Sequence, residues 1–117
     1  MPKQQKVELW IKLSLPGIGQ VGPGKMHLLR LIDEHQSIAA AARAMGMSYR
    51  RAWLLVEELN GLFSEPVVSK WQGGPSQGGA SLTAFGKKLM QRYAALVENA
   101  NAANRKLLEE LGRDLAQ

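Results

Sequence analysis

A glycine-rich stretch near the N-terminus carries the spacing of two nucleotide-binding loops. It matches G-x-G-x-x-G from Gly17 to Gly22 and most of a Walker A loop from Gly19 to Lys25. A Walker A loop needs a hydroxyl residue after its lysine to hold magnesium, and Met26 stands there. A dinucleotide fold needs a parallel strand after the helix and an acid about twenty residues past the glycines, but an alanine-rich, acid-free segment follows. We interpret the stretch as a connecting loop, with a nucleotide-binding protein as the alternative.

The remaining residues do not suggest a catalytic or metal site. The chain contains no cysteine, which excludes disulfides, thiolate zinc ligands and a cysteine nucleophile. His27 and His35 have Asp33 and Glu34 beside the second of them, but no third ligand group is suggested elsewhere. We therefore predict that the protein is not an enzyme and has no metal or cofactor.

Basic residues gather in two acid-free windows. The net charge is +5, and residues 35–56 contain Arg43, Arg50 and Arg51 without an acid. Residues 66–97 also lack acids and contain four basic residues, which are Lys70, Lys87, Lys88 and Arg92. A basic chain with its charge clustered in this way is typical of proteins with a polyanionic partner, although charge runs are also common on ordinary surfaces.

The first basic window has the pattern of a helix-turn-helix. Residues 23–35 repeat leucines at helical spacing, Ser37 caps an alanine-rich helix that stops at Gly46, and Ser48 caps a third helix ending near residues 60–61. Trp53 falls on the apolar stripe of this third helix and is expected in the core. Two helices joined by a short turn form a helix-turn-helix, whose second helix enters the major groove. The N-terminal residues of that helix reach the DNA, so we assign DNA contacts to Ser48, Tyr49, Arg50 and Arg51, with a solvated helical hairpin as the alternative.

Strands are predicted on both sides of these helices. Apolar residues alternate with polar ones from Val7 to Leu15, which is typical of a strand with one buried face. Residues 67–71 and Ala80–Leu82 are predicted to pair around a glycine-rich tip, forming a wing. Trp10 and Trp71 are expected to pack under neighbouring elements.

A long amphipathic helix is predicted from Thr83 to the C-terminus without interruption. Its apolar stripe is longer than one small core can cover, so a second copy of the chain is the expected partner. The residues that we assign to dimerisation are Phe85, Leu89, Tyr93, Leu96, Ala100, Leu107 and Leu111, with Leu115 continuing the stripe.

These elements define the expected fold class, which is mainly α with a small antiparallel β wing. We predict a single winged helix-turn-helix domain over residues 1–117, with the DNA-binding core and wing in residues 1–82 and the dimerisation helix in residues 83–117. No secretion signal or membrane span is apparent, so a cytoplasmic protein is expected.

Two stretches resemble a known family of bacterial regulators. SIAAAARAMGMSYRRAW and GGPSQGGASLTAFGKKLM are similar to the N-terminal DNA-binding domain of the molybdate-responsive regulator ModE, which is related to the winged domain of LysR-type regulators. The resemblance extends from Ile11 to about Leu96. It implies base and phosphate contacts from the start of the recognition helix, wing contacts within residues 70–79, and dimerisation through the first strand and the last helix. The further DNA-contacting residues assigned on this basis are Ser37, Lys70, Gln72, Gly73, Gly74, Ser76 and Gln77.

Family members continue beyond the winged domain into molybdate-binding domains, whereas this sequence ends at Gln117. We therefore expect a regulator of molybdate transport or molybdenum-related genes without its own molybdate site, with a separate effector-sensing partner as one source of its signal. The predicted partners are double-stranded DNA and a second copy of the chain. A dimeric interaction module that does not bind DNA is a further alternative.

Overall fold

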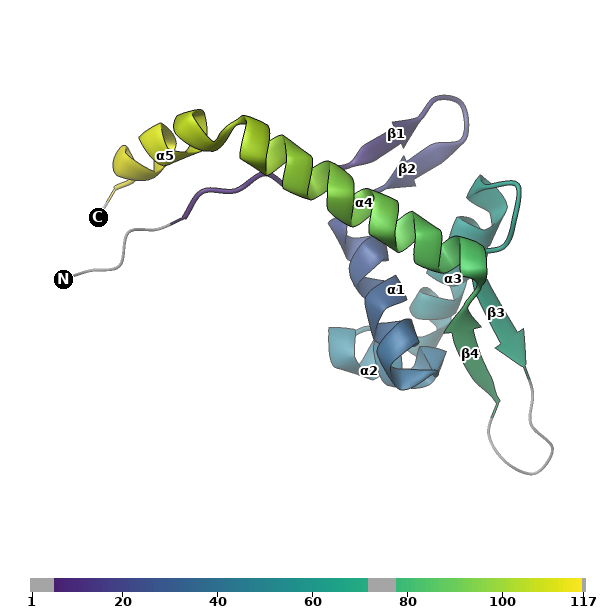
Figure 1. Ribbon diagram of the computed structural model, residues 1–117. Helices are drawn as coiled ribbons and strands as arrows, with labels where there is room; N and C mark the ends of the chain where they lie inside the picture. Colours follow the sequence, from purple (N-terminus) through teal and green to yellow (C-terminus); the bar gives the residue numbers. More distant parts are fainter. Residues whose placement is uncertain (1–5, 72–77, 117) are drawn as a thin grey trace.

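The computed structural model describes residues 6–71 and 78–116. Figure 1 shows a body of short helices and hairpins crossed by one long helix, which leads the C-terminal end of the chain away from the body. The elements, in chain order, are β1 (Leu13–Leu15), β2 (Gly19–Val21), α1 (Pro23–His35), α2 (Ile38–Met45), α3 (Tyr49–Leu62), β3 (Val68–Trp71), β4 (Gly79–Leu82), α4 (Ala84–Ala103) and α5 (Arg105–Arg113). The fold is mainly helical with a small antiparallel wing, as predicted, and it has a second small antiparallel hairpin near the N-terminus.

The first hairpin corrects the prediction that residues 17–24 form only a loop. Strand β2 pairs antiparallel with β1, with Leu13 opposite Val21. Gly17 has a φ of +75° in the turn, and the N–H of Ile18 donates to the carbonyl of Leu15 at 2.8 Å. The sequence pattern missed β2 because the strand is short and opens with a glycine, which strands disfavour.

The residues before β1 follow the predicted alternation but form less of a strand than expected. Exposed and half-buried residues alternate from residue 6 to residue 15. Only Leu13–Leu15 pairs with another strand, and the residues before it lie along α4 instead. The hydroxyl of Tyr93 on α4 donates to the carbonyl of Ile11 at 2.5 Å. Hydrogen bonds from a helix therefore take the place of a strand ladder here.

The predicted caps define the helices of the body. The Ser37 hydroxyl oxygen accepts a hydrogen bond from the N–H of Ala40 at 3.0 Å at the start of α2, and Gly46 ends that helix with a φ of +68°. The Ser48 hydroxyl oxygen accepts from the N–H of Arg51 at 3.1 Å at the start of α3. Such caps satisfy backbone donors that have no partner within the helix. The two helices with the short turn between them are the predicted helix-turn-helix.

The core lies between α1, α2 and α3 and extends to the second hairpin. Its fully buried members from the three helices are Leu28, Leu29, Ile32, Ala41, Ala52, Val56 and Leu59. The alanines let α2 approach its neighbours closely. Helix α3 continues to Leu62, so Gly61 lies within its last turn, whereas an end near residues 60–61 was predicted.

The second hairpin is the predicted wing. Strand β3 pairs antiparallel with β4, with Val68 opposite Leu82 and Trp71 opposite Gly79. The N–H of Ala80 donates to the carbonyl of Gln36 at 3.1 Å, which joins β4 to the end of α1. The hairpin projects from the side of the body (Figure 1).

An uninterrupted C-terminal helix was predicted, but the helix breaks at Asn104. This residue has φ −113° and ψ 18°, and α5 begins after it. Its side-chain amide donates to the carbonyl of Ala100 at 2.7 Å. An asparagine that hydrogen-bonds nearby backbone competes with continuation of the helix, which explains the break. Among the described helices, none has the length and apolar character needed to cross a membrane.

Candidate nucleic-acid interface

The predicted DNA-contacting residues of the recognition helix lie together at the exposed start of α3. All four are exposed to solvent: Ser48, Tyr49, Arg50 and Arg51. Tyr49 is 56% exposed. The hydroxyl oxygen of Ser48 accepts the capping bond, so its own proton is available for donation outward. This end of the helix therefore presents hydroxyl and guanidinium donors, and the helix dipole adds positive potential.

Trp53 lies on the exposed face of α3, so its prediction as a core residue is wrong. Ala52, Val56 and Leu59 are fully buried, whereas Trp53 is 39% exposed and Leu54 is 49% exposed. Because an α-helix has 3.6 residues per turn, the spacing of the buried residues places position 53 to one side of the core-facing line.

Lys70 on the wing lies above Trp53. Its ammonium nitrogen is 4.9 Å from the centre of the Trp53 ring, and it forms an ion pair with Glu57. The cation thus bridges strand β3 to the outward face of α3. Sequence reasoning missed this role of Trp53 and Glu57, because only the fold brings the wing beside the helix.

The ion pair of Lys25 makes the nucleotide-binding alternative weaker. The Lys25 ammonium group donates to Glu58 on α3 at 2.7 Å and to the carbonyl of Gln20 at 2.7 Å. Met26, at the position where a Walker A loop has its hydroxyl, is buried in the core. The lysine therefore ties the first hairpin to α3.

The wing is attached to the end of α3 through Asn60. The Asn60 amide oxygen accepts from the N–H groups of Val67 and Val68 at 2.7 and 2.9 Å, and its amide nitrogen donates to the Val68 carbonyl at 3.0 Å. Thr83 caps α4 and also donates through its hydroxyl to the Pro66 carbonyl at 2.7 Å. These bonds fix the base of the wing relative to α3.

The other predicted contacts are distributed around this interface. Ser37 is half-buried at the N-cap of α2, and Lys70 lies on strand β3 of the wing. The ring of Trp71 lies against Gly79 of the neighbouring strand β4, as the expectation of packing on a neighbouring element requires. The residue is nevertheless 46% exposed. The predicted wing-tip residues Gln72, Gly73, Gly74, Ser76 and Gln77 lie outside the described residues.

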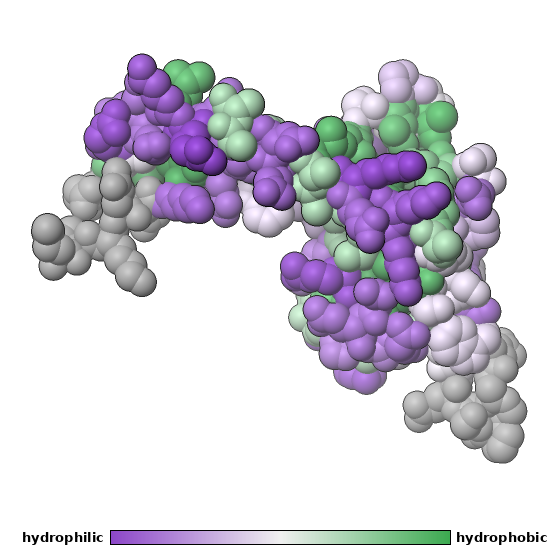
Figure 2. Space-filling view, in the orientation of Figure 1, coloured by the Kyte–Doolittle hydropathy of each residue, from purple (hydrophilic) through white to green (hydrophobic). Residues whose placement is uncertain are grey.

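The residues predicted for dimerisation differ in their exposure. Leu89 and Tyr93 are buried within this chain, and the ring of Phe85 packs on Phe63 at 5.4 Å between centroids. Ala100 is half-buried. The exposed members are Leu96 at 47%, Leu107 at 59% and Leu111 at 53%, with Leu115 at 39%. Figure 2 shows mainly hydrophilic side chains along α4 and α5, with hydrophobic residues exposed among them.

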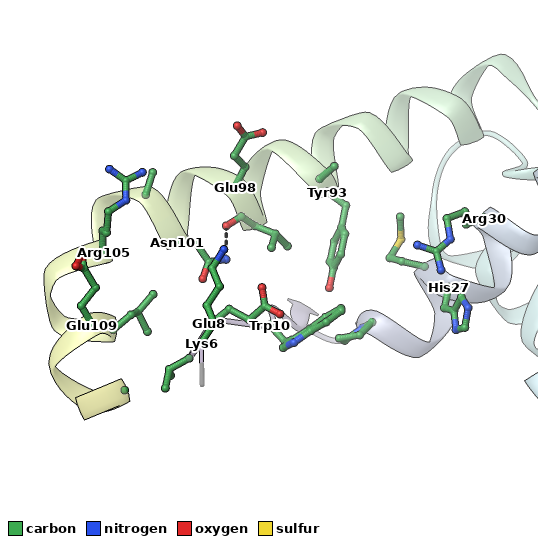
Figure 3. Close-up of a pocket in the computed structure, with 18 of the residues that line it drawn as sticks. Lys6, Glu8, Trp10, His27, Arg30, Tyr93, Glu98, Asn101, Arg105 and Glu109 are labelled. Carbon is green, nitrogen blue, oxygen red and sulfur yellow. Dashed lines mark hydrogen bonds between the residues drawn. The ribbon is translucent and has the colours of Figure 1, made fainter. Parts of the chain in front are cut away.

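A cleft of about 1230 Å³ lies between α1, α4, α5 and the N-terminal segment, which consists of residues 6–12 before β1 (Figure 3). The N–H of Leu9 donates to the side-chain oxygen of Asn101 at 2.7 Å, which holds the segment along α4. Trp10 lines the cleft with 68% exposure, so its expected packing under a neighbouring element is wrong for the single chain. The charged lining residues carry both signs, and they include Arg30, Glu98 and Arg105 (Figure 3).

Tyr93 forms one wall of the cleft. Burial raises the pKa of the Tyr93 phenol above its ordinary value of 10.0.

Among the described residues, no group of three or more His, Asp or Glu side chains is placed to hold a metal ion.

The chain is similar to molybdenum-related proteins over about three quarters of its length. It is 43% identical to the molybdenum-pterin-binding protein MopB of Rhodobacter capsulatus over 77 residues, which cover 66% of this chain and 28% of MopB. It is 34% identical to the molybdenum transport protein ModE of Azotobacter vinelandii over 87 residues, covering 74% of this chain and 32% of that protein. It is 33% identical to the DNA-binding transcriptional dual regulator ModE of Escherichia coli K12 over 93 residues, covering 80% of this chain and 36% of the regulator.

The chain spans about a third of the length of the curated relatives it matches. No protein-family model matches it. The named relatives are regulators or binding and transport proteins, and the match to ModE falls in its N-terminal region.

Proposed function

Because the chain is homologous to the N-terminal region of ModE regulators, we propose that it is a sequence-specific DNA-binding transcriptional regulator. It binds double-stranded DNA as a homodimer and acts on genes for molybdate transport or other molybdenum-related functions. The names of the relatives MopB and ModE supply the connection to molybdenum.

The observation that carries this proposal is the exposed basic start of α3. Arg50 and Arg51 follow the capped N-terminus of the second helix of a helix-turn-helix, where recognition helices reach base edges. Each guanidinium group can donate two parallel hydrogen bonds to guanine O6 and N7. Ser48 and Tyr49, beside them, have hydroxyl groups suited to phosphate oxygens.

Contacts from other elements would fix the protein on the duplex. The start of α2 offers Ser37 and free backbone N–H groups to a phosphate. Strand β3 of the wing offers Lys70. The wing tip is proposed to contribute the residues Gln72, Gly73, Gly74, Ser76 and Gln77.

A second copy of the chain is the proposed occupant of the cleft and of the exposed leucine stripe. The radius of gyration is 17.3 Å, compared with about 13 Å expected for a compact domain of this length. The excess reflects the limb made by the N-terminal segment, the end of α4 and α5 (Figure 1). This limb exposes Leu107, Leu111 and Trp10, and pairing with another copy would bury them.

The experiment that tests DNA binding compares operator and random duplexes. An operator is first selected from a randomised duplex library with the wild-type protein, and affinities are measured by fluorescence anisotropy. Arg50→Ala or Arg51→Ala should weaken operator binding by on the order of 1–3 kcal/mol and relax base preference at one position. Arg92→Ala is the matched control, because it removes the same charge from an exposed position on α4 that does not line the cleft.

Equal losses on operator and random duplexes would remove the base-reading role of these arginines. A wild-type protein that enriches no sequence and shifts no duplex, yet sediments as a dimer, would instead support the interaction module without DNA binding.

A further inference from the structure

A large aliphatic side chain occupies the middle of the outward face of α3. Leu54 is 49% exposed, and the buried residues of the helix, such as Val56 and Leu59, lie on the opposite side. It follows Arg50 by one helical turn, so the two side chains are neighbours along the same face. Side chains on a helix lean toward its N-terminus, which brings Leu54 closer to the arginines.

Leu54 and the arginines share one surface feature. A shallow hollow of about 350 Å³ is lined by Ser48, Arg50, Arg51, Leu54, Leu55 and Glu58. The hollow therefore combines an apolar side chain with the two guanidinium groups to which base contacts are assigned.

The acids on this face do not oppose the approach of DNA with full charge. Glu57 and Glu58 follow Leu54 on the helix, and they are paired with Lys70 and Lys25 respectively. A single exposed leucine is common on protein surfaces and needs no explanation. Here, Tyr49 and Trp53 are also exposed on the same helix, so apolar groups gather where the basic residues would bring a duplex.

We propose that Leu54 is a specificity-determining residue that contacts the 5-methyl group of a thymine beside the base pairs read by Arg50 and Arg51. This inference rests on the proposed DNA-binding function. Thymine is the base that presents an apolar group in the major groove, and aliphatic side chains recognise it by excluding water from that methyl group. The neighbouring arginines would read guanine, so the motif would contain both bases in adjacent positions.

Uracil substitution tests the contact directly, because deoxyuridine keeps the pairing and the O4 acceptor of thymine but lacks the methyl group. Each thymine of the selected operator is replaced in turn by deoxyuridine, and binding is measured by fluorescence anisotropy. One replacement should weaken wild-type binding about fourfold, which corresponds to one methyl-sized group left in contact with water. Leu54→Ala should weaken binding to the thymine duplex by a similar factor and lose its sensitivity to that replacement.

Two variants control for indirect effects. Leu54→Met keeps an apolar side chain of similar size and should retain the sensitivity to deoxyuridine. Ile18→Ala removes another exposed aliphatic side chain, in the turn of the first hairpin, and should respond to deoxyuridine as the wild type does. Thermal unfolding and sedimentation of Leu54→Ala should match the wild type, since the side chain lies outside the core.

The outcomes separate this inference from the proposed function. If the wild type binds its selected operator but no thymine replacement matters, or if Leu54→Ala remains equally sensitive, the thymine contact is wrong and DNA binding stands. A loss of dimerisation in Leu54→Ala would assign the residue to the protein interface and would also overturn the contact. Failure to bind any duplex would overturn the DNA-binding function itself.

Discussion

At the residue scale, both acids in the second half of α3 are paired with lysines from other elements. Lys25 comes from the start of α1, and Lys70 comes from the wing. Exposed ion pairs of this kind contribute little to stability, typically about 0–1 kcal/mol. Their consequence here is electrostatic, because each pair lowers the negative potential of a helix that is proposed to approach phosphates.

The pairing of Lys70 leads to a prediction about salt dependence. If the Lys70 ammonium group donates to a DNA phosphate while it remains paired with Glu57, Lys70→Ala should weaken binding to operator and random duplexes alike. The slope of log affinity against log salt should become smaller by about one, because one phosphate contact releases about one counterion. Glu57→Gln leaves Lys70 free and should change the affinity in the opposite direction. An unchanged slope in Lys70→Ala would show that Lys70 contacts no phosphate and binds only Glu57 and Trp53 when DNA is bound.

At the element scale, close backbone contacts determine how α4 lies on the body. A Cβ atom on Gly86 would collide with the carbonyl oxygen of Val67, which is a backbone atom and cannot move aside freely. Tyr93 lies two turns further along α4 and binds the N-terminal segment. These contacts position the helix between the wing base on one side and the N-terminal segment on the other.

Gly86→Ala should destabilise the protein by on the order of 1–3 kcal/mol, because the added methyl group overpacks the contact between α4 and the residue before β3. Urea unfolding followed by circular dichroism measures the change. Gly61→Ala is the matched control, since nothing lies within 4 Å of its added Cβ atom, and it should be neutral or stabilising by up to about 1 kcal/mol. Equal effects of the two substitutions would contradict the collision.

Tyr93→Phe should cost about 1 kcal/mol at neutral pH through the lost hydrogen bond to Ile11. The sign of its pH dependence follows from the raised pKa of Tyr93. A group whose pKa is higher in the folded state contributes stability below its unfolded pKa and loses it as the pH rises through the folded pKa. The wild-type advantage should therefore shrink above pH 10, where the phenol ionises first in the unfolded chain. Urea midpoints of the two proteins at neutral and alkaline pH check this, and a constant difference would contradict it.

At the scale of the whole molecule, the limb formed by the N-terminal segment, the end of α4 and α5 gives the protein an extended shape. Its extents are 56 × 35 × 22 Å. The tie between Leu9 and Asn101 makes the N-terminal segment and α4 one structural unit. We expect that unit to be the surface on which a second copy binds.

A double substitution of Leu107→Asp and Leu111→Asp should therefore weaken dimerisation and operator binding together. A two-fold dimer presents two recognition helices about 34 Å apart, so the operator should be an inverted repeat with half-sites one helical turn or a multiple apart. Sedimentation and anisotropy on the same samples measure both effects. Ile18→Asp is the control, because Ile18 is 63% exposed but lies in the turn of the first hairpin. A double variant that remains dimeric with full affinity would move the interface elsewhere, with the N-terminal segment near Trp10 as the next candidate.

Local signals in the sequence determined the helix-turn-helix, the wing strands and the exposed start of the recognition helix. Ser37, Gly46 and Ser48 act through hydrogen bonds and dihedral preferences within a few residues, so their roles could be predicted without a structure. The alternation of apolar and polar residues before β1 could also be interpreted without a structure, because half-buried and exposed residues alternate there in the same order.

Only the tertiary structure decided which side chains meet across elements. Trp53 was predicted in the core because it falls on the apolar stripe assigned to the third helix, but the wing that places Lys70 above it comes from a distant segment. The break at Asn104 depends on a single side-chain bond that competes with helix continuation, which periodicity does not register. Leu89 and Tyr93 belong to the same stripe as Leu96, yet they are buried because the body of the chain covers only the first part of α4. Periodicity identifies an apolar face, whereas packing decides how far along that face its own chain reaches.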